Sequence, residues 1–160
     1  MAAYEATIRW QRSADEAFTD QRYSRSHRWL FDGGAEVIAS SSPHSVRVPF
    51  SDPAAVDPEE ALVAALSSCH MLFFLWFAAR RGFSIASYTD KAIGEMGREP
   101  DGKEWMKRVT LRPEVVFDGE KHPAEEDVSE LHHLSHQACY IANSVTSEIL
   151  IEGTAQGIAG

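Results

Sequence analysis

Two cysteines carry the most reactive side chains of this sequence. Cys69 lies within a long apolar stretch, and Cys139 follows 70 positions later. A cysteine thiolate can attack a peroxide, and a second thiol can then condense with the resulting sulfenic acid to form a disulfide. Only the fold can bring such a pair together, because no Cys-x-x-Cys motif joins it locally. The alternative is two unrelated buried cysteines, since free cysteine is among the most buried residue types.

The surroundings of Cys69 favour a chemical role. It belongs to the run Ser67-Ser68-Cys69-His70, a polar break inside an otherwise hydrophobic helix. Polar groups in an apolar helix cost stability, so a break of this kind often marks a site. A reactive thiolate also needs a nearby cation, a hydrogen-bond donor or a helix N-terminus. Cys69 lies some three turns into its predicted helix, so we expect a cation from elsewhere in the fold.

The upstream arginines that could supply this cation are Arg25, Arg28 and Arg47, and Glu59 could orient the one that does. Glu59 precedes Cys69 by ten residues. That spacing corresponds to about 15 Å along a straight helix, so the carboxylate cannot reach the thiolate from its own helix. If Glu59 works with Cys69, either an intervening arginine bridges them or the carboxylate comes from a second subunit.

A group of histidines offers a different chemistry. His132 and His136 share one face of a predicted helix, His133 lies beside them, and Cys139 follows one turn after His136. Such a group could bind zinc or copper. A structural site usually has four ligands, however, and Cys69 would have to join from the other segment. We therefore expect no metal, and we expect these histidines to cover the second helix near a subunit interface.

Composition limits the class of protein. The chain has 160 residues, a formal net charge of −9 and a hydrophobic fraction of 44%. These values predict a single domain over residues 1–160 that folds without metal or disulfide, and they make nucleic acid and membrane surfaces improbable partners. The N-terminal segment Met1-Ala2-Ala3-Tyr4-Glu5 lacks the features of a signal peptide. We therefore expect a cytoplasmic protein whose cysteines are normally thiols.

The first part of the chain predicts an N-terminal β region over residues 1–56. Ala3 to Trp10 alternates as a half-buried strand, and Asp32-Gly33-Gly34 is typical of a tight hairpin turn between two more strands. A long central helix follows at about 57–81, with Asp57 as its cap, Pro58 in its first turn and Gly82 as its stop. Its apolar length approaches that of a membrane span, but the polar residues at its middle favour a buried core helix.

The second part of the chain predicts a β hairpin over about 83–117, made of one strand at 83–96 and another at 105–117. A second helix is expected at about 123–139, because three acidic residues follow Pro123. A final short strand is expected at about 147–152, and residues 153–160 are expected to be a loose tail. Together these elements predict an α+β fold.

Two segments resemble the OsmC/Ohr family, the osmotically inducible and organic hydroperoxide resistance proteins. The run from Asp57 to His70 is similar to the first-cysteine segment of that family. The family's usual leucine falls one position earlier than Leu62, where this chain has Ala61. The run from His132 to Val145 resembles the second-cysteine segment. The order of strands and helices also agrees, so the resemblance covers nearly the whole chain. His70 and the histidine-rich second segment suggest an outlying branch.

The resemblance implies antiparallel sheets packed around a long hydrophobic helix and a second helix, in an intertwined homodimer. It implies that Cys69 attacks an organic hydroperoxide and that Cys139 condenses with the sulfenic acid to a disulfide, which a dithiol or a lipoylated protein then reduces. Glu59 is the family's carboxylate position, Arg25 resembles its arginine and Arg47 is the alternative. No cofactor is implied. A non-catalytic protein that binds a hydrophobic ligand or a metal and responds to redox state is the competing hypothesis.

Overall fold

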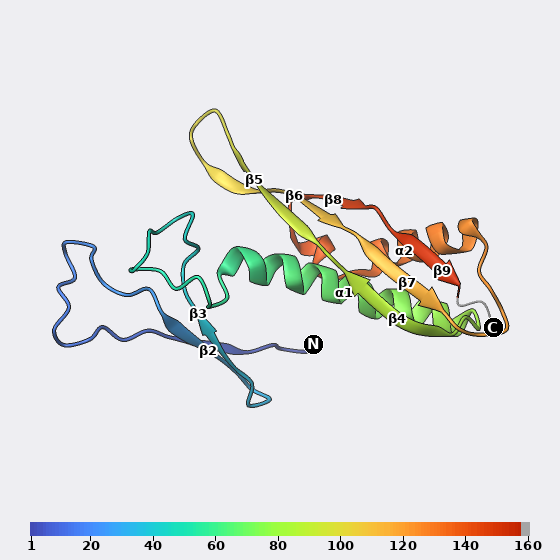
Figure 1. Cartoon of the computed structure of the whole chain (residues 1–160), viewed down its shortest axis with the longest axis horizontal. Coiled ribbons are helices and arrows are strands. Elements are labelled where there is room, and N and C mark those ends of the chain that lie inside the picture. The colour runs from blue at the N-terminus through green and yellow to red at the C-terminus, as the bar shows by residue number, and fades with distance from the viewer. Residues whose placement is uncertain (158–160) are drawn as a thin grey trace. The chain divides into compact units, whose positions relative to one another are not determined.

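The structure is a computed structural model that describes residues 1–157 (Figure 1). By its internal contacts the chain forms two compact units, Met1–Ala61 and Leu62–Gly160. The long helix α1, Pro58–Arg80, begins in the first unit and continues through the second. It corresponds to the helix expected at about 57–81.

The first unit contains a three-stranded antiparallel sheet. Its strands are β1 (Ala6–Arg9), β2 (His27–Phe31) and β3 (Glu36–Ala39), in that order. The predicted hairpin turn between β2 and β3 is confirmed, and Gly34 adopts a φ of 87° that a side chain would strain. The sheet has little core of its own, since Ile8 and Ile38 remain 60% and 58% exposed.

Both ends of α1 are fixed by the signals that the sequence contains. At its start, the Glu60 N–H donates to Asp57 Oδ1 at 2.8 Å, and the Asp57 N–H donates to Glu60 Oε2 at 3.3 Å. This reciprocal capping box satisfies two backbone donors that the helix leaves unpaired. At its end, Gly82 adopts a left-handed φ of 76°, and the Phe83 N–H donates to the Ala78 carbonyl. The predicted cap and stop are therefore confirmed.

Within the chain, α1 buries a single stripe along its length. Its buried residues recur at every fourth position: Leu66, His70, Phe74 and Ala78. By length and composition the helix could cross a membrane, and within the chain its buried His70 pairs with a second helix. Only 22% of its most apolar window is buried, and Leu72 and Trp76 remain 60% and 49% exposed. A second apolar face of α1 thus lies uncovered in the single chain.

The strands after α1 form two sheets instead of one long hairpin. The two predicted strands are each divided, into β4 (Ile85–Asp90) and β5 (Ile93–Arg98), and into β6 (Glu104–Leu111) and β7 (Pro113–Phe117). β4 pairs with β7 in one sheet, and β5 pairs with β6 in the other. The break occurs where the Arg112 N–H donates to the Asp90 side chain at 2.6 Å and where Pro113 has no N–H to donate.

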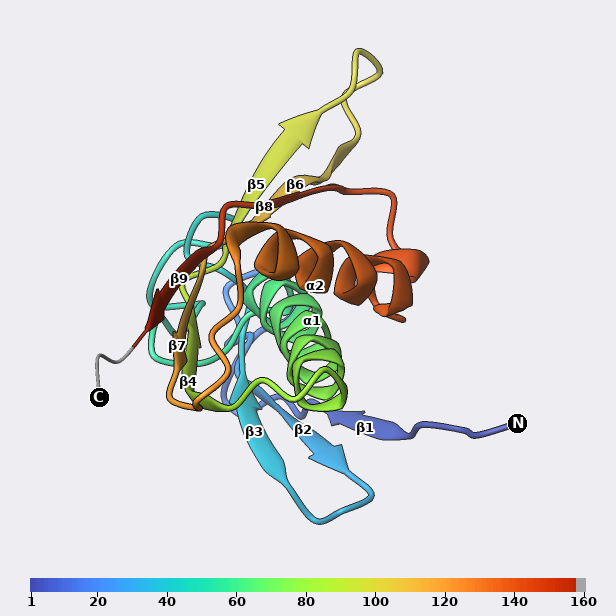
Figure 2. The same ribbon diagram turned by 90° about the vertical axis from the view of Figure 1, so that its right-hand side faces the viewer.

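The C-terminal part of the described chain completes both sheets. β8 (Glu148–Ile151) pairs in parallel with β6, and β9 (Thr154–Gly157) pairs in parallel with β7. The prediction of a loose tail is therefore wrong for residues 154–157, because β7 offers them an open edge. Residues 158–160 lie outside the described part of the chain. Figure 2 shows the second helix α2, Glu125–Ala138, beside α1.

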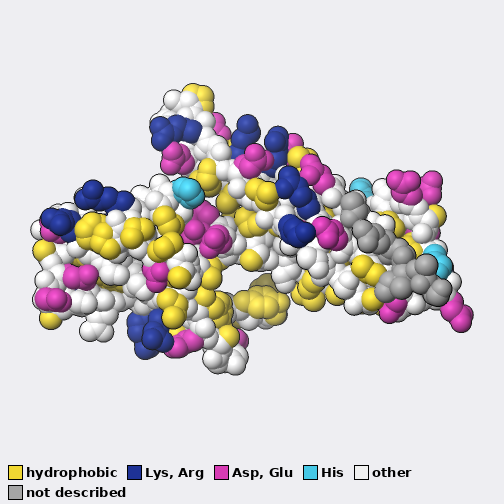
Figure 3. Space-filling model, viewed as in Figure 1, with side chains coloured by type: hydrophobic (Ala, Val, Ile, Leu, Met, Phe, Trp, Pro, Cys, Tyr) yellow, Lys and Arg dark blue, Asp and Glu magenta, His cyan; other side chains and the backbone are white. Residues whose placement is uncertain are grey.

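Side chains from both helices and both sheets of the second unit form its core. One cluster joins α1, α2, β7 and the segment after α1: Phe74, Ala78, Phe83, Val115, Phe117, Val128 and Leu131. A second cluster joins α1 to β6: Leu66, Val109 and Leu111. On the face shown in Figure 3, basic and acidic side chains are interspersed among apolar ones. The core thus fixes how α2 lies against α1, where both cysteines are found.

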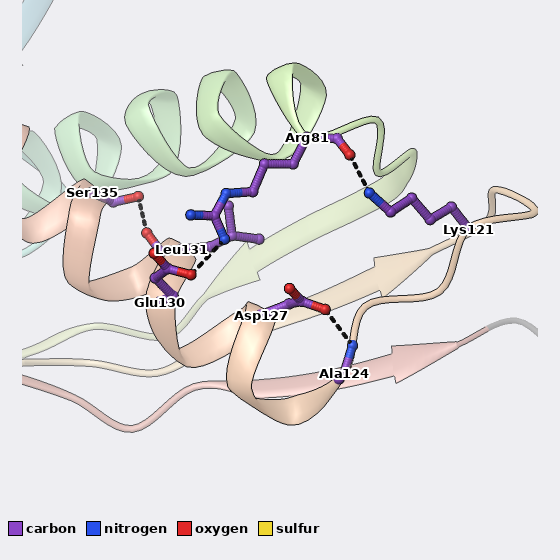
Figure 4. A network of polar contacts seen from close by, with 7 residues as sticks. All are labelled: Arg81, Lys121, Ala124, Asp127, Glu130, Leu131 and Ser135. Carbon is purple, nitrogen blue, oxygen red and sulfur yellow. Dashed lines mark hydrogen bonds and ion pairs between the residues drawn. The ribbon is translucent and has the colours of Figure 1, made fainter.

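The far end of the contact between α1 and α2 is held by polar groups (Figure 4). The Arg81 guanidinium donates to the Glu130 carboxylate at 2.8 Å, and Lys121 Nζ donates to the Arg81 carbonyl at 2.6 Å. The second interaction satisfies a carbonyl that the end of α1 leaves without a helical partner. These contacts tie the end of α1 to the first half of α2 and to the loop before it.

A close approach between α1 and β5 leads to a stability prediction. A Cβ at Gly94 would lie 2.6 Å from both Val63 Cγ2 and Met106 Sδ. We expect Gly94→Ala to lower the free energy of unfolding by about 1–3 kcal/mol, because the packed neighbours must move. Urea unfolding measures the change. Gly33→Ala is the control, since a Cβ there meets no atom within 4 Å. Equal effects of the two substitutions would contradict the packing argument.

Candidate active site

The structure brings the two cysteines together where α1 meets the end of α2. Cys69 lies midway along α1, and Cys139 is the residue at which α2 ends. Both are free thiols, and the Cys69 side chain interacts with that of Cys139. They differ in accessibility, since Cys69 is partly exposed and Cys139 is 0% exposed. A reagent from solution therefore meets Cys69 first.

Local backbone geometry positions the sulfur of Cys139. The Cys139 N–H still donates to the Ser135 carbonyl at 2.9 Å, but the residue itself has left the helical conformation. A short 3-10 turn, Ala142–Ser144, follows. From this turn the Ala142 N–H donates to Cys139 Sγ at 3.4 Å, and the Asn143 N–H donates to the Cys139 carbonyl at 3.0 Å. The end of α2 and the turn after it thus hold the thiol on both sides.

The two thiols occupy different electrostatic environments. Burial raises the pKa of Cys139 to about 11, and the neighbouring Cys69 thiol raises it further. The backbone N–H groups of Ala142 and Ile141 act in the opposite direction, but they do not offset burial. Cys139 therefore remains a protonated thiol at neutral pH. The arrangement provides one accessible sulfur and, near it, one buried sulfur that keeps its proton.

Two buried histidines form a hydrogen bond immediately beside the cysteines. His70 Nε2 lies 3.0 Å from His132 Nδ1, and the two residues are 1% and 7% exposed. Their ring planes differ by 11° and their centroids lie 5.3 Å apart. That separation fits two nearly coplanar rings joined edge to edge by the hydrogen bond, so the contact is not a face-to-face stack. One ring donates its N–H and the other accepts with its lone pair.

Burial keeps both histidines neutral. It lowers the pKa of His70 to about 3, with His132 and His136 as further causes, and it lowers the pKa of His132 to about 4. From the sequence His70 is expected to be part of a polar break and a mark of an outlying branch, and its pairing with His132 is not predicted. One signal was present, since His132 lies seven residues, or about two turns, before Cys139 and so shares its helix face.

The predicted alternative of a metal site does not match the geometry. Among residues 1–157, no group of three or more His, Cys, Asp or Glu side chains is arranged to hold a metal ion. His132 pairs with His70 instead of joining His136 and Cys139 as a ligand set. Nδ1 of His136 is buried and makes no hydrogen bond within the described part of the chain.

In the first unit, Arg25 is held by its own loop. Its Nη1 donates to the carbonyls of Gln21 and Tyr23 at 2.7 and 2.5 Å, and its guanidinium carbon lies 3.8 Å from the centroid of the Tyr23 ring. Gln21 has a left-handed φ of 61°, which is uncommon for a residue with a side chain. The loop thus fixes the direction of this guanidinium.

The other arginines and Glu59 are arranged differently. Arg28 pairs with Glu36 across the β2–β3 hairpin, and Arg47 is exposed, with its guanidinium carbon 5.8 Å from the centroid of the Phe50 ring. Glu59 is half-buried in the first turn of α1, and within residues 1–157 it makes no salt bridge. The predicted pairing of Glu59 with an arginine is therefore not formed in the single chain.

Aromatic side chains lie next to the cysteine pair. Phe73 follows Cys69 by one turn of α1, and Tyr140 directly follows Cys139. Their rings meet edge to face with centroids 5.2 Å apart. Tyr140 is 69% exposed, so this aromatic pair reaches the surface. It presents an apolar surface beside the accessible sulfur.

Comparisons with known proteins point to one family. The family model described as "OsmC-like protein" matches residues 51–153. A solved structure of an OsmC-like protein of unknown function from Vibrio cholerae shares 51% sequence identity, with a TM-score of 0.94, and the match covers 96% of this chain and 100% of that chain. No curated protein matches the sequence.

More distant structures share the fold. An organic hydroperoxide resistance protein from Elizabethkingia anophelis is 16% identical, with a TM-score of 0.67 over 99% of this chain and 98% of that one. The organic hydroperoxide resistance protein of Bacillus subtilis is 14% identical, with a TM-score of 0.63 over 97% and 98%. At these identities the likeness concerns the fold alone.

Proposed function

Because the chain belongs to the OsmC-like protein family, we propose that it is a thiol-dependent peroxidase that reduces organic hydroperoxides with Cys69 and Cys139. The observation that carries this proposal is an accessible thiol close enough to a buried thiol to raise the pKa of the buried one. The names of two structural relatives, organic hydroperoxide resistance proteins, agree with it. The apolar surface formed by Phe73 and Tyr140 suits an alkyl group beside the peroxide.

The proposed reaction has two steps in the protein and one with a reductant. The Cys69 thiolate attacks the hydroperoxide ROOH, the O–O bond breaks, and, after uptake of one proton from solvent, the products are ROH and the Cys69 sulfenic acid. The Cys139 thiol then attacks that sulfur, and its proton leaves with the sulfenic hydroxyl as water while the disulfide forms. A dithiol or a lipoylated protein donates two electrons and two protons to restore both thiols.

Stoichiometric oxidation tests this function. Reduced protein is mixed with one equivalent of cumene hydroperoxide, and free thiols and the remaining peroxide are then measured. We expect two thiols to disappear for each peroxide consumed, and dihydrolipoamide to restore them. If the peroxide remains and both thiols survive, the peroxidase proposal fails, and ligand binding on the same fold becomes the better hypothesis.

The proposed role of Arg25 is to stabilise the Cys69 thiolate and the peroxide oxygens, with Glu59 orienting a guanidinium. Arg25 is favoured over Arg47 because two backbone carbonyls already orient its side chain. We expect Arg25→Met to slow the first oxidation by about 100-fold, comparable to the loss of one preorganised donor to a developing charge. Stopped-flow oxidation by cumene hydroperoxide measures the rate. Arg47→Met is the control, and a larger loss in that variant would transfer the role to Arg47.

We also propose that the active form is a homodimer in the cytoplasm. The single chain leaves large apolar side chains exposed on two surfaces, Leu72 and Trp76 on α1 and Ile8 and Ile38 on the N-terminal sheet. Apolar surfaces of this kind mark sites of association. A second copy would cover them, and it would also allow Glu59 and the arginine to act on a thiol of the partner.

A further inference from the structure

Two neighbouring contacts join the middle of α1 to α2. One is the interaction between the neighbouring thiols of Cys69 and Cys139, seen in the raised pKa of Cys139, and the other is the hydrogen bond between His70 and His132. On α1 the two contacts come from consecutive residues, Cys69 and His70, so their side chains leave the helix about 100° apart. On α2 they lie seven residues apart, about two turns along one face. Any pivot of α2 about the thiols would therefore break the imidazole bond.

We infer that the His70–His132 pair is a positioning clamp that fixes α2 against α1 and thereby keeps the Cys139 sulfur beside the Cys69 sulfur. This inference concerns the disulfide step of the proposed function, and it does not depend on the identity of the oxidant. Neither histidine contacts a reacting atom in this role.

The packing around His132 leaves its ring little room to move. The Phe74 ring lies against it with centroids 4.4 Å apart. On another side, a Cβ at Gly153 would lie 2.7 Å from His132 Nε2, so only a glycine fits there without displacing the ring. His132 Nε2 itself makes no hydrogen bond among the described residues. The bond to His70 is thus the polar contact that orients this imidazole.

The charged and titratable groups nearby do not compete for the bond. His136 faces the pair from α2, and burial and His132 keep His70 neutral beside it. Asp90, on β4, acts on His132 only through its charge. Its oxygens already accept hydrogen bonds from Ser67 Oγ and from the backbone N–H of Arg112, the residue before β7. Tyr88, also on β4, has a raised pKa because it is buried, so it adds no charge. A neutral N–H···N bond is therefore the state of the pair at neutral pH.

This bond matters for the cysteines because a disulfide has strict geometry. The Cα atoms must approach to less than about 7 Å, and the Cβ atoms must point toward one another. Cys139 lies at the very end of α2, where helix termini fray most easily. A clamp two turns before it limits the excursions of that end. The expected consequence is a higher equilibrium constant for the Cys69–Cys139 disulfide.

The test measures this equilibrium constant against glutathione at pH 7. We expect His132→Phe, which keeps an aromatic ring but loses the nitrogen, to lower it at least about tenfold, because His70 loses its buried partner. His132→Asn places an amide where Nδ1 was, and we expect it to stay within about threefold of the wild type. His133→Phe is the matched control, since His133 is the exposed neighbour on the same helix. A wild-type value for His132→Phe, or an equal loss in His132→Asn, would overturn the clamp.

The same comparison is available from α1, in case His132→Phe does not fold. His70→Gln keeps a polar group near the position of Nε2, whereas His70→Leu removes it, and the clamp requires only the leucine variant to lose disulfide stability. Glutathione replaces peroxide in all of these measurements. A protein that consumes no peroxide can therefore still show the predicted loss of disulfide stability in the variants. If the protein is an active peroxidase but the variants keep the wild-type disulfide equilibrium constant, only the clamp is refuted.

Discussion

Replacing Cys69 by serine is expected to abolish the reduction of cumene hydroperoxide, with a loss of at least about 1,000-fold, as for other enzymes that lose their nucleophile. The serine hydroxyl is not ionised at neutral pH and does not attack the O–O bond, whereas Cys69 is the sulfur that solvent reaches. Stopped-flow consumption of peroxide by the reduced protein measures the first turnover. Ser68→Ala, an exposed neighbour on α1, controls for disturbance of the helix and should retain the wild-type rate.

Replacing Cys139 by serine should have a different effect. The first turnover stays close to the wild-type rate, because Cys139 is buried and protonated and takes no part in the attack. The sulfenic acid then has no thiol partner and is oxidised further to sulfinic acid, which mass spectrometry detects. Turnover with dihydrolipoamide is lost accordingly. If Cys69→Ser kept a fast first turnover and Cys139→Ser lost it, the roles of the two cysteines would be reversed.

Acid should destabilise the reduced protein far more than its surface charges would suggest. The folded-state pKa values of His70 and His132 lie at about 3 and about 4, below the ordinary value of 6.5. Below pH 6.5 the two histidines therefore bind protons in the unfolded chain but stay unprotonated in the folded chain. The free energy of unfolding falls as the pH falls. The two sites together should lower the free energy of unfolding by about 4 kcal/mol between pH 7 and pH 5. Urea unfolding at fixed protein concentration measures this difference.

The histidine pair can be separated from other acid effects by substitution. The double variant His70→Leu with His132→Phe replaces both partners of a buried hydrogen bond by apolar groups, an exchange that can be nearly neutral for stability. Its stability should change by less than about 1 kcal/mol between pH 7 and pH 5, because the two depressed sites are gone. His133→Leu should retain the wild-type acid sensitivity. Equal stability of the wild type at both pH values would show that the pair is not the titrating element.

Local signals explain which parts of the fold the sequence predicts well. The start of α1 depends on Asp57 and Glu60, which cap each other within one turn, and its end depends on Gly82. The division of the long hairpin, in contrast, depends on Asp90, which binds Ser67 on α1 and the backbone of Arg112. Those partners are distant in sequence, so no local pattern reveals the break. The strand at 154–157 likewise exists because β7 provides an edge.

The candidate site divides in the same way. The cysteines stand out by type, and the polar break around Cys69 is visible in the sequence. Which face of α2 meets α1 is a property of the packed core, so the partner of His70 cannot be read from spacing alone. The choice between Arg25 and Arg47 also depends on loop contacts, the two carbonyls that hold the Arg25 guanidinium. Nonlocal contacts therefore account for what the sequence leaves open.

The polar contacts around Glu130 hold the first half of α2 against α1, and the opposite end of the helix carries Cys139. Arg81 binds Glu130, and Lys121, in the loop before α2, binds the Arg81 carbonyl. With the His70–His132 bond holding the middle of α2, we expect any opening of the contact between the helices to be confined to the turns between His132 and Cys139. A reductant that must reach the buried sulfur gains access by swinging one end of a helix, and the rest of the core stays packed.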